Sequence, residues 1–205
     1  MNSGGGAPSN TSHLSPLMST QLSNTTVAIL ATDGFEQVEL LKPKQALEDA
    51  GATVHVVSPE SGTIKGWDQD HWDQDVTVDK TLADADAGSY DALVLPGGQI
   101  NPDKLRIDGD ALDFVKAFAS AGKPIAAICH APWLLVETGL AKGRRLTSYK
   151  SIRTDLKNAG ADVTDEPVVR DEDGPFPIVT SRNPDDIPAF NEAIVEVFAL
   201  AGQPA

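Results

Sequence analysis

The chain has 205 residues, of which 40% are hydrophobic and 22% charged, as in a soluble globular domain and unlike a collagenous, disordered or disulfide-framework chain. Thirty acidic and sixteen basic residues give a formal net charge of −14. This charge disfavours nucleic-acid and anionic-membrane partners, because both recruit Lys and Arg. The single cysteine, Cys129, excludes an intramolecular disulfide and a multi-cysteine zinc site, and it fits a cytoplasmic location.

The first 24 residues differ in composition from the rest of the chain. They contain six Ser, three Gly and no charged residue. Their one apolar cluster, at 14–18, is too short for a signal peptide, and no apolar run in the chain reaches membrane-spanning length. We therefore predict a disordered tail over 1–24 and a single domain over 25–202.

From Thr25 onward, predicted strands and helices alternate. Four apolar runs are expected to form strands, at 25–30, 52–59, 91–98 and 123–129. Helical patterns cover 38–50, 110–122, 131–139 and about 185–200. Pro43 weakens the first of these helices unless it lies in the first turns. Further short strands are expected near Leu146, Val163, Val168 and Ile178. Alternation with continuously apolar strands predicts an α/β fold, in which helices cover both faces of a mostly parallel sheet.

An acidic segment lies between the second and third strands, with eight Asp from Asp68 to Asp91. Its DQD repeats suggest a calcium loop, but the EF-hand spacing and the terminal Glu are missing. We favour a charged excursion that covers a sheet edge or a subunit surface, anchored by Trp67 and Trp72. No metal site is predicted.

Candidate functional residues gather where predicted strands end, the edge at which open parallel sheets bind ligands. Cys129 stands where a strand stops and a helix begins, like a nucleophile elbow, although G-x-S-x-G is absent. We expect the helix start and His130 to lower the pKa of this thiol. The alternatives are an inert buried cysteine and a histidine that only caps the helix.

Two further strand ends carry candidates. Gly97 and Gly98 directly follow a strand, and their N–H groups would stabilise an oxyanion unless they only form a turn. Glu36 follows the first strand, either as a helix-start residue or as a hydrogen-bond partner of the thiol. The chain contains neither G-x-G-x-x-G nor G-x-x-x-x-G-K-[ST], so no dinucleotide or nucleotide cofactor is expected.

Together these motifs resemble the PfpI family of intracellular cysteine protease-like proteins, part of the glutamine-amidotransferase-like group that includes the parkinsonism-associated protein deglycase. The resemblance spans about Thr26 to Leu200 and implies a flavodoxin-like, doubly wound α/β sandwich in homodimers or homohexamers. It rests on these segments: GFEQVEL (34–40), DALVLPGG (91–98), NPDKLR (101–106), GKPIAAICHAPWLL (122–135), LTSY (146–149) and VTSRNPDDIPAF (179–190).

The resemblance also implies roles for individual residues. Cys129 would be a nucleophile in a strained backbone conformation, with His130 as its base. Glu36 would hydrogen-bond the sulfur through a protonated carboxyl, and Asp103 of a neighbouring subunit would orient the histidine. Ala131, where many members have Gly, would narrow the substrate pocket. No histidine follows His130, so the glutamine amidotransferase triad is absent.

The function expected from this resemblance is that of a stress-response enzyme, whose cysteine attacks small carbonyls or glycated groups without a cofactor. Peptidase, deglycase and glyoxalase activities are all reported in the family, and a shallow site at a strand end suits a small oxoaldehyde better than a peptide. The expected partners are a small-molecule or glycated-protein substrate and other copies of the chain. The alternatives are a redox-sensing protein that acts through oxidation of Cys129 and an oligomer with a vestigial site.

Overall fold

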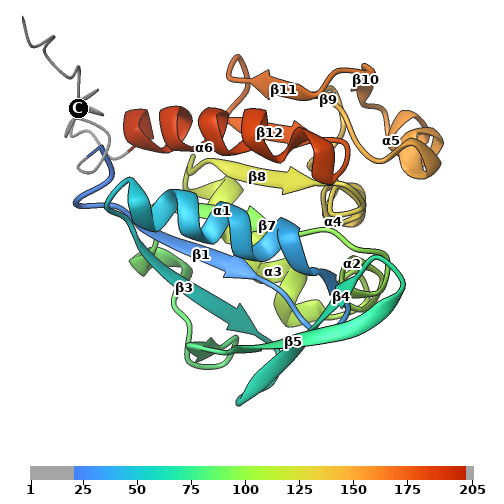
Figure 1. Ribbon diagram of the computed structural model, residues 1–205. Coiled ribbons are helices and arrows are strands. Elements are labelled where there is room, and N and C mark those ends of the chain that lie inside the picture. The colour runs from blue at the N-terminus through green and yellow to red at the C-terminus, as the bar shows by residue number, and fades with distance from the viewer. Residues whose placement is uncertain (1–20, 202–205) are drawn as a thin grey trace, which may run out of the picture.

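A seven-stranded sheet lies at the centre of the computed structural model, which describes residues 21–201 (Figure 1). Its order is β11-β12-β8-β7-β1-β3-β6. All neighbours are parallel except β11 and β12, which are antiparallel. The strands are β1 (Thr26–Leu30), β3 (Thr53–Ser58), β6 (Lys80–Thr81), β7 (Ala92–Leu95), β8 (Ile125–Ile128), β11 (Val168–Asp171) and β12 (Ile178–Ser181). The predicted α/β fold is confirmed.

The central strands are apolar throughout because both faces of the sheet are covered. Side chains alternate along β1: Val27 and Ile29 join one core cluster, whereas Ala28 and Leu30 join the other. The first cluster includes side chains of α1 and α6, and the second includes side chains of α3, α4 and α5. The helices are α1 (Gln37–Asp49), α2 (Ile100–Leu105), α3 (Gly109–Ser120), α4 (Trp133–Glu137), α5 (Arg153–Asn158) and α6 (Ile187–Ala201).

Helix α1 continues through Pro43, which is buried at its seventh position rather than in the first turns. Because proline has no N–H, the carbonyl four residues earlier, that of Glu39, loses its helical hydrogen bond. None of the helices within residues 21–201 combines the length and the hydropathy that a membrane span requires.

The acidic segment folds differently from our expectation. It forms a hairpin of β4 (Thr63–Asp68) and β5 (His71–Thr77), which joins β2 (Phe35–Glu36) in a separate three-stranded sheet. Only its end covers an edge of the central sheet, where β6 pairs with β3. Trp67 and Trp72 pack edge to face at 5.3 Å, and Trp72 stays 45% exposed. Two short strands, β9 (Arg145–Leu146) and β10 (Asp162–Val163), form a further pair.

The folded region begins before the predicted boundary at residue 25. Leu22 is fully buried in the core cluster beneath α1 and α6, and its N–H donates to the carbonyl of Ala50. The prediction of disorder is therefore wrong for residues 21–24, because one apolar side chain suffices to attach this segment to the core. The rest of the predicted tail, 1–20, and residue 202 lie outside the described residues.

Candidate active site

The candidate residues lie at one edge of the central sheet because parallel strands bring their carboxyl ends together. Gly97 and Gly98 follow β7, Cys129 follows β8, and residues 182–185 follow β12. These segments are bonded to one another: the N–H of Cys129 donates to the carbonyl of Ser181 at 3.0 Å. The neighbouring strand β12 therefore helps to fix the position of the cysteine.

Cys129 has φ of 65°, in the left-handed region that costs a non-glycine residue about 1–2 kcal/mol. Its carbonyl accepts a hydrogen bond from the N–H of Tyr149 at 2.8 Å, and only 6% of the residue is exposed. The strain agrees with the sharp turn expected at this junction. Helix α4, however, begins only at Trp133, four residues later, so the thiol does not stand at a helix N-terminus.

His130 lies against the cysteine and is itself 7% exposed. Its Nδ1 is 3.2 Å from Cys129 Sγ, and its Nε2 is 3.2 Å from the hydroxyl of Ser151. The ring stacks on Tyr149 at 4.6 Å and meets the edge of Trp133 at 5.3 Å. Burial lowers the pKa of His130, so the imidazole is neutral at physiological pH and can accept a proton.

The carboxyl beside the cysteine belongs to Glu39, and the prediction of Glu36 for this place is wrong. Glu39 is fully buried beside Cys129 and accepts the N–H of Gly98 at 3.1 Å through one oxygen, while its Oε1 has no hydrogen-bond partner within the described residues. Glu36 precedes α1 as part of β2, is only half-buried, and accepts the N–H of Gln69 at 3.4 Å. Both acids belong to the segment GFEQVEL, one helical turn apart, and only the start of the helix decides which of them faces the thiol.

The pKa of Glu39 is raised to about 8, first by burial and then by the nearby charge of Glu36. Burial, with the Glu39 carboxylate second, also raises the pKa of the Cys129 thiol, although the N–H groups of Gly98 and His130 lower it in part. The expected depression of the thiol pKa is therefore not found. Because the two groups are in contact, they titrate as a pair. At neutral pH this pair holds both of its protons.

The glycine pair makes room for this contact. A Cβ at Gly97 would overlap the Glu39 carboxyl and Cys129 Cβ, and Gly98 has φ of 78°. In the resting site the N–H of Gly98 donates to Glu39 at 3.1 Å, and the N–H groups of both Gly98 and His130 lie close enough to the sulfur to lower the thiol pKa in part. The glycines thus allow the backbone to lie close to Glu39 and Cys129. Their role in stabilising an oxyanion stays a prediction.

The two remaining predicted residues lie away from the thiol. Asp103 is exposed on α2. Within the described chain, the hydrogen-bond partners of the His130 ring are Cys129 and Ser151, not Asp103. Ala131 is fully buried in the core cluster under α3 and α4, and its N–H donates to Ile128. The expectation that Ala131 lines the pocket is wrong, because the turn after Cys129 directs it into the core.

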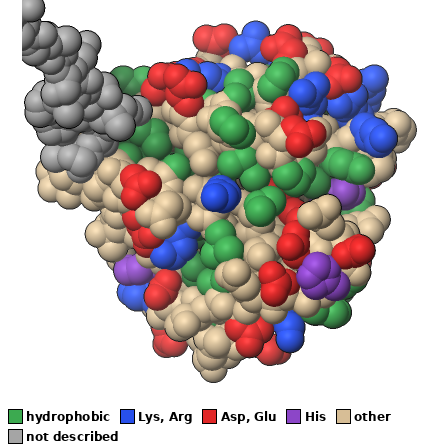
Figure 2. Space-filling model, in the orientation of Figure 1, with side chains coloured by type: hydrophobic (Ala, Val, Ile, Leu, Met, Phe, Trp, Pro, Cys, Tyr) green, Lys and Arg blue, Asp and Glu red, His purple; other side chains and the backbone are tan. Residues whose placement is uncertain are grey.

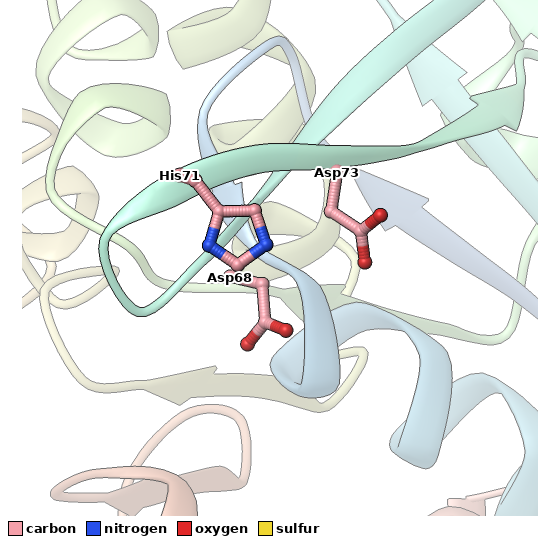
Figure 3. Close-up of side chains that lie close together, drawn as sticks. All are labelled: Asp68, His71 and Asp73. Carbon is pink, nitrogen blue, oxygen red and sulfur yellow. The ribbon is translucent and has the colours of Figure 1, made fainter.

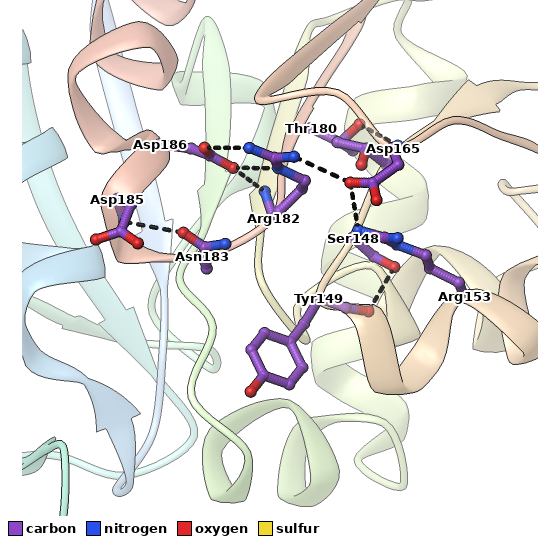
Figure 4. Close-up of polar contacts among 10 residues, drawn as sticks. Ser148, Tyr149, Arg153, Asp165, Thr180, Arg182, Asn183, Asp185 and Asp186 are labelled. Carbon is purple, nitrogen blue, oxygen red and sulfur yellow. Dashed lines mark hydrogen bonds and ion pairs between the residues drawn. The ribbon is translucent and has the colours of Figure 1, made fainter.

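A pocket of about 810 Å³ has Tyr149, the residue that stacks on His130, in its wall, but neither Cys129 nor His130 lines it. Seven of its twelve lining residues are charged, and Figure 4 shows Arg182 held between Asp186 and Asp165, with Arg153 also bound to Asp165. Glu36 also belongs to its wall. In the view of Figure 2, acidic and basic side chains are interspersed over most of the surface. The pocket therefore suits a polar ligand.

A second cluster of polar side chains lies at the tip of the β4–β5 hairpin, where Asp68, His71 and Asp73 approach one another (Figure 3). His71 and Asp73 are exposed. His71 Nδ1 is 2.8 Å from the carboxylate of Asp70, which raises the pKa of the imidazole.

Comparisons with known proteins agree with this geometry. The profile of the "DJ-1/PfpI family" matches residues 25–197. The chain is 46% identical to "Putative cysteine protease YraA" of Bacillus subtilis, over 80% of this chain and 93% of that one. It is 43% identical to "Protein/nucleic acid deglycase 2" of Escherichia coli, over 80% and 92%. The crystal structure of Drosophila melanogaster DJ-1beta has a TM-score of 0.76 and 30% identity, over 85% and 90% of the two chains.

Proposed function

The chain belongs to the DJ-1/PfpI family, and on this premise we propose that it is a stress-response enzyme whose cysteine attacks reactive carbonyl groups. One observation carries the proposal. Cys129 is held in a strained backbone conformation with its sulfur between the imidazole of His130 and the buried carboxyl of Glu39. The backbone strain at Cys129 costs free energy of folding and gives no stability in return. Strained residues of this kind concentrate at functional sites.

The first step follows from the protonation states of the resting site. Sγ of Cys129 attacks the carbonyl carbon, and its proton passes to Nδ1 of the neutral His130. The electrons of the C=O bond move to oxygen, which then takes the proton back from the imidazolium. The product is a neutral hemithioacetal, so the step needs no cofactor. The N–H groups of His130 and Gly98 are the candidates to stabilise the developing oxyanion.

The substrate class we propose is a small dicarbonyl, or its adduct on a protein side chain. The pocket is larger than a three-carbon oxoaldehyde needs, and its charged lining suits a polar adduct. The names of the relatives point to two chemistries, proteolysis and deglycation. We favour carbonyl chemistry because the sulfur is a buried, protonated thiol, and attack on a peptide amide benefits more from a preformed thiolate.

The test compares wild type with Cys129→Ala on methylglyoxal, on a methylglyoxal-glycated peptide and on a fluorogenic peptide. We expect dicarbonyl loss or adduct removal that requires Cys129. Cleavage of the fluorogenic peptide alone would replace our proposal with a peptidase. Activity that persists in Cys129→Ala would exclude the cysteine as nucleophile.

Redox sensing through Cys129 is the alternative. It requires a thiolate that reaches peroxide, but the sulfur is a 6% exposed thiol whose pKa is raised by burial. Mass spectrometry after peroxide treatment separates the alternatives. Oxidation of Cys129 at micromolar peroxide, without any carbonyl activity, would favour the sensor.

We also keep two expectations as proposals: a cytoplasmic location and a homodimer or homohexamer in which Asp103 reaches His130 of a second copy. Exposure of Asp103 on α2 leaves its carboxylate free for such a contact. Mixing inactive Asp103→Ala with inactive Cys129→Ala should restore partial activity, because some mixed dimers carry one intact site. No recovery after verified subunit exchange would rule out a contribution of Asp103 from the partner.

A further inference from the structure

We propose that Ser151 is a positioning residue for His130, and that its hydroxyl sets the reactive tautomer of the imidazole from within the same chain. The inference rests on the proposed function, in which His130 accepts the thiol proton. The sequence gives no signal for Ser151, an exposed serine in the short helix η3 (Lys150–Ile152).

The tautomer follows from the two partners of the ring. Nδ1 lies 3.2 Å from Sγ of Cys129, and Nε2 lies 3.2 Å from Oγ of Ser151. Nδ1 accepts the thiol proton only if it carries no hydrogen of its own, so the hydrogen of the neutral ring must be on Nε2. Nε2–H then donates to Oγ of Ser151. The same bond persists in the imidazolium that forms when the thiol is deprotonated.

The loop that carries Ser151 is fixed to the site at several points. The N–H of Tyr149 donates to the carbonyl of Cys129 at 2.8 Å, and the tyrosine ring stacks on His130. The N–H of Thr147 donates to the buried hydroxyl of Thr180 at 2.9 Å, and Ile152 is 1% exposed in the core. The backbone on both sides of Ser151 is therefore anchored, and the hydroxyl is presented to Nε2 without further ordering.

Within one chain, Ser151 occupies the nitrogen at which a triad carboxylate would bind. Asp103 of a second copy would reach Nε2 only by displacing or sharing this hydroxyl, so the two proposals are tested against each other below. Within the described residues no acid contacts His130, and burial is the one cause that shifts its pKa. A hydroxyl orients the ring but does not stabilise its charge as a carboxylate does. A histidine oriented by serine thus stays neutral at rest and returns its proton readily, as the proposed step requires.

The experiment compares wild type with Ser151→Ala, Ser151→Thr and Ser151→Asp, with Thr154→Ala as the control for an exposed hydroxyl on α5. The readouts are kcat and KM for methylglyoxal, the alkylation rate of Cys129 against pH, and ¹⁵N NMR of the His130 ring. Loss of one hydrogen bond predicts a roughly tenfold lower kcat in Ser151→Ala, with KM nearly unchanged. In that variant the NMR signal should move toward the tautomer with hydrogen on Nδ1.

Threonine should restore both readouts because it keeps the hydroxyl, and aspartate should raise the pKa of His130. Unchanged tautomer and kcat in Ser151→Ala would overturn the proposal, as would the same changes arising only from Asp103→Ala. The NMR and alkylation readouts need no substrate. Absence of carbonyl activity in wild type would therefore refute the proposed function. The NMR and alkylation measurements would still test the role of Ser151.

Discussion

Replacing Glu39 by Gln isolates the energetic effect of a buried carboxyl beside the cysteine. The amide has nearly the same shape, its oxygen can accept the N–H of Gly98, and its NH₂ group can donate to Cys129 Sγ. The substitution therefore removes the titration while it leaves the hydrogen-bonding pattern in place. We expect the free energy of unfolding to lose much of its dependence on pH.

The magnitude follows from the pKa of Glu39, which is raised from an ordinary 4.5 to about 8. Between these values the native state keeps a proton that the unfolded chain has released. Stability is thus fully present below pH 4.5 and is lost as pH rises through 8. At about 1.4 kcal/mol for each pH unit, the loss between pH 5 and pH 8 is about 3–4 kcal/mol.

The assay is urea denaturation of wild type and Glu39→Gln from pH 5 to pH 8, with Glu36→Gln as the control one helical turn earlier. In the difference between wild type and Glu39→Gln, the titrating groups that do not interact with Glu39 cancel. Wild type should lose about 3–4 kcal/mol relative to the variant across this range. Glu36 is half-buried, so its replacement should change the slope much less. Equal slopes in wild type and Glu39→Gln would refute the protonated carboxyl.

Three further substitutions test other parts of the structure. Gly97→Ala should separate Glu39 from the thiol and destabilise by about 1–3 kcal/mol, seen as a lower Tm together with altered alkylation of the cysteine. Arg144→Ala should cost about 3–5 kcal/mol in urea denaturation, because the carboxylate it binds at 2.8 Å stays buried, and a cost below about 1 kcal/mol would contradict this. Leu22→Ala should lower the free energy of unfolding by about 2–5 kcal/mol, because Leu22 is fully buried. Leu200→Ala, at a 62% exposed position, should lower it by less than about 0.5 kcal/mol. Equal effects of the two substitutions would show that residue 22 is not part of the core.

The central sheet was predictable because its strands are apolar on both faces. Runs such as 25–30 and 123–129 leave little choice between a buried strand and any other element, and the sheet then brings their ends together. The position of Cys129 at one of these ends was therefore accessible from the sequence. Strand β5 of the hairpin was not, because its side chains are almost all exposed and lack the apolar alternation that identifies a strand.

The identity of the site carboxyl depended on tertiary structure. Glu36 and Glu39 stand in one segment, three residues apart, and the local sequence does not distinguish which of them faces the thiol. The pairing of β2 with β4 holds Glu36 in extended backbone and lets the helix begin at Gln37. That pairing involves a hairpin some thirty residues away, so no local pattern could reveal it.

The three titratable groups buried at the cysteine are uncharged at rest, and this bears on the reaction that we propose. The thiol and the Glu39 carboxyl keep their protons at neutral pH, and His130 is neutral because burial lowers its pKa. Burying these groups as ions would require a counterion, whereas burying them neutral requires only hydrogen bonds. In the reaction that we propose, the thiol proton moves to His130 as the substrate binds. An aldehyde accepts such an attack readily, because its oxygen takes the proton back and the adduct is neutral. A peptide amide gains more from a thiolate that exists before the substrate binds. These protonation states are the premise on which our proposal of carbonyl addition, rather than peptide hydrolysis, rests.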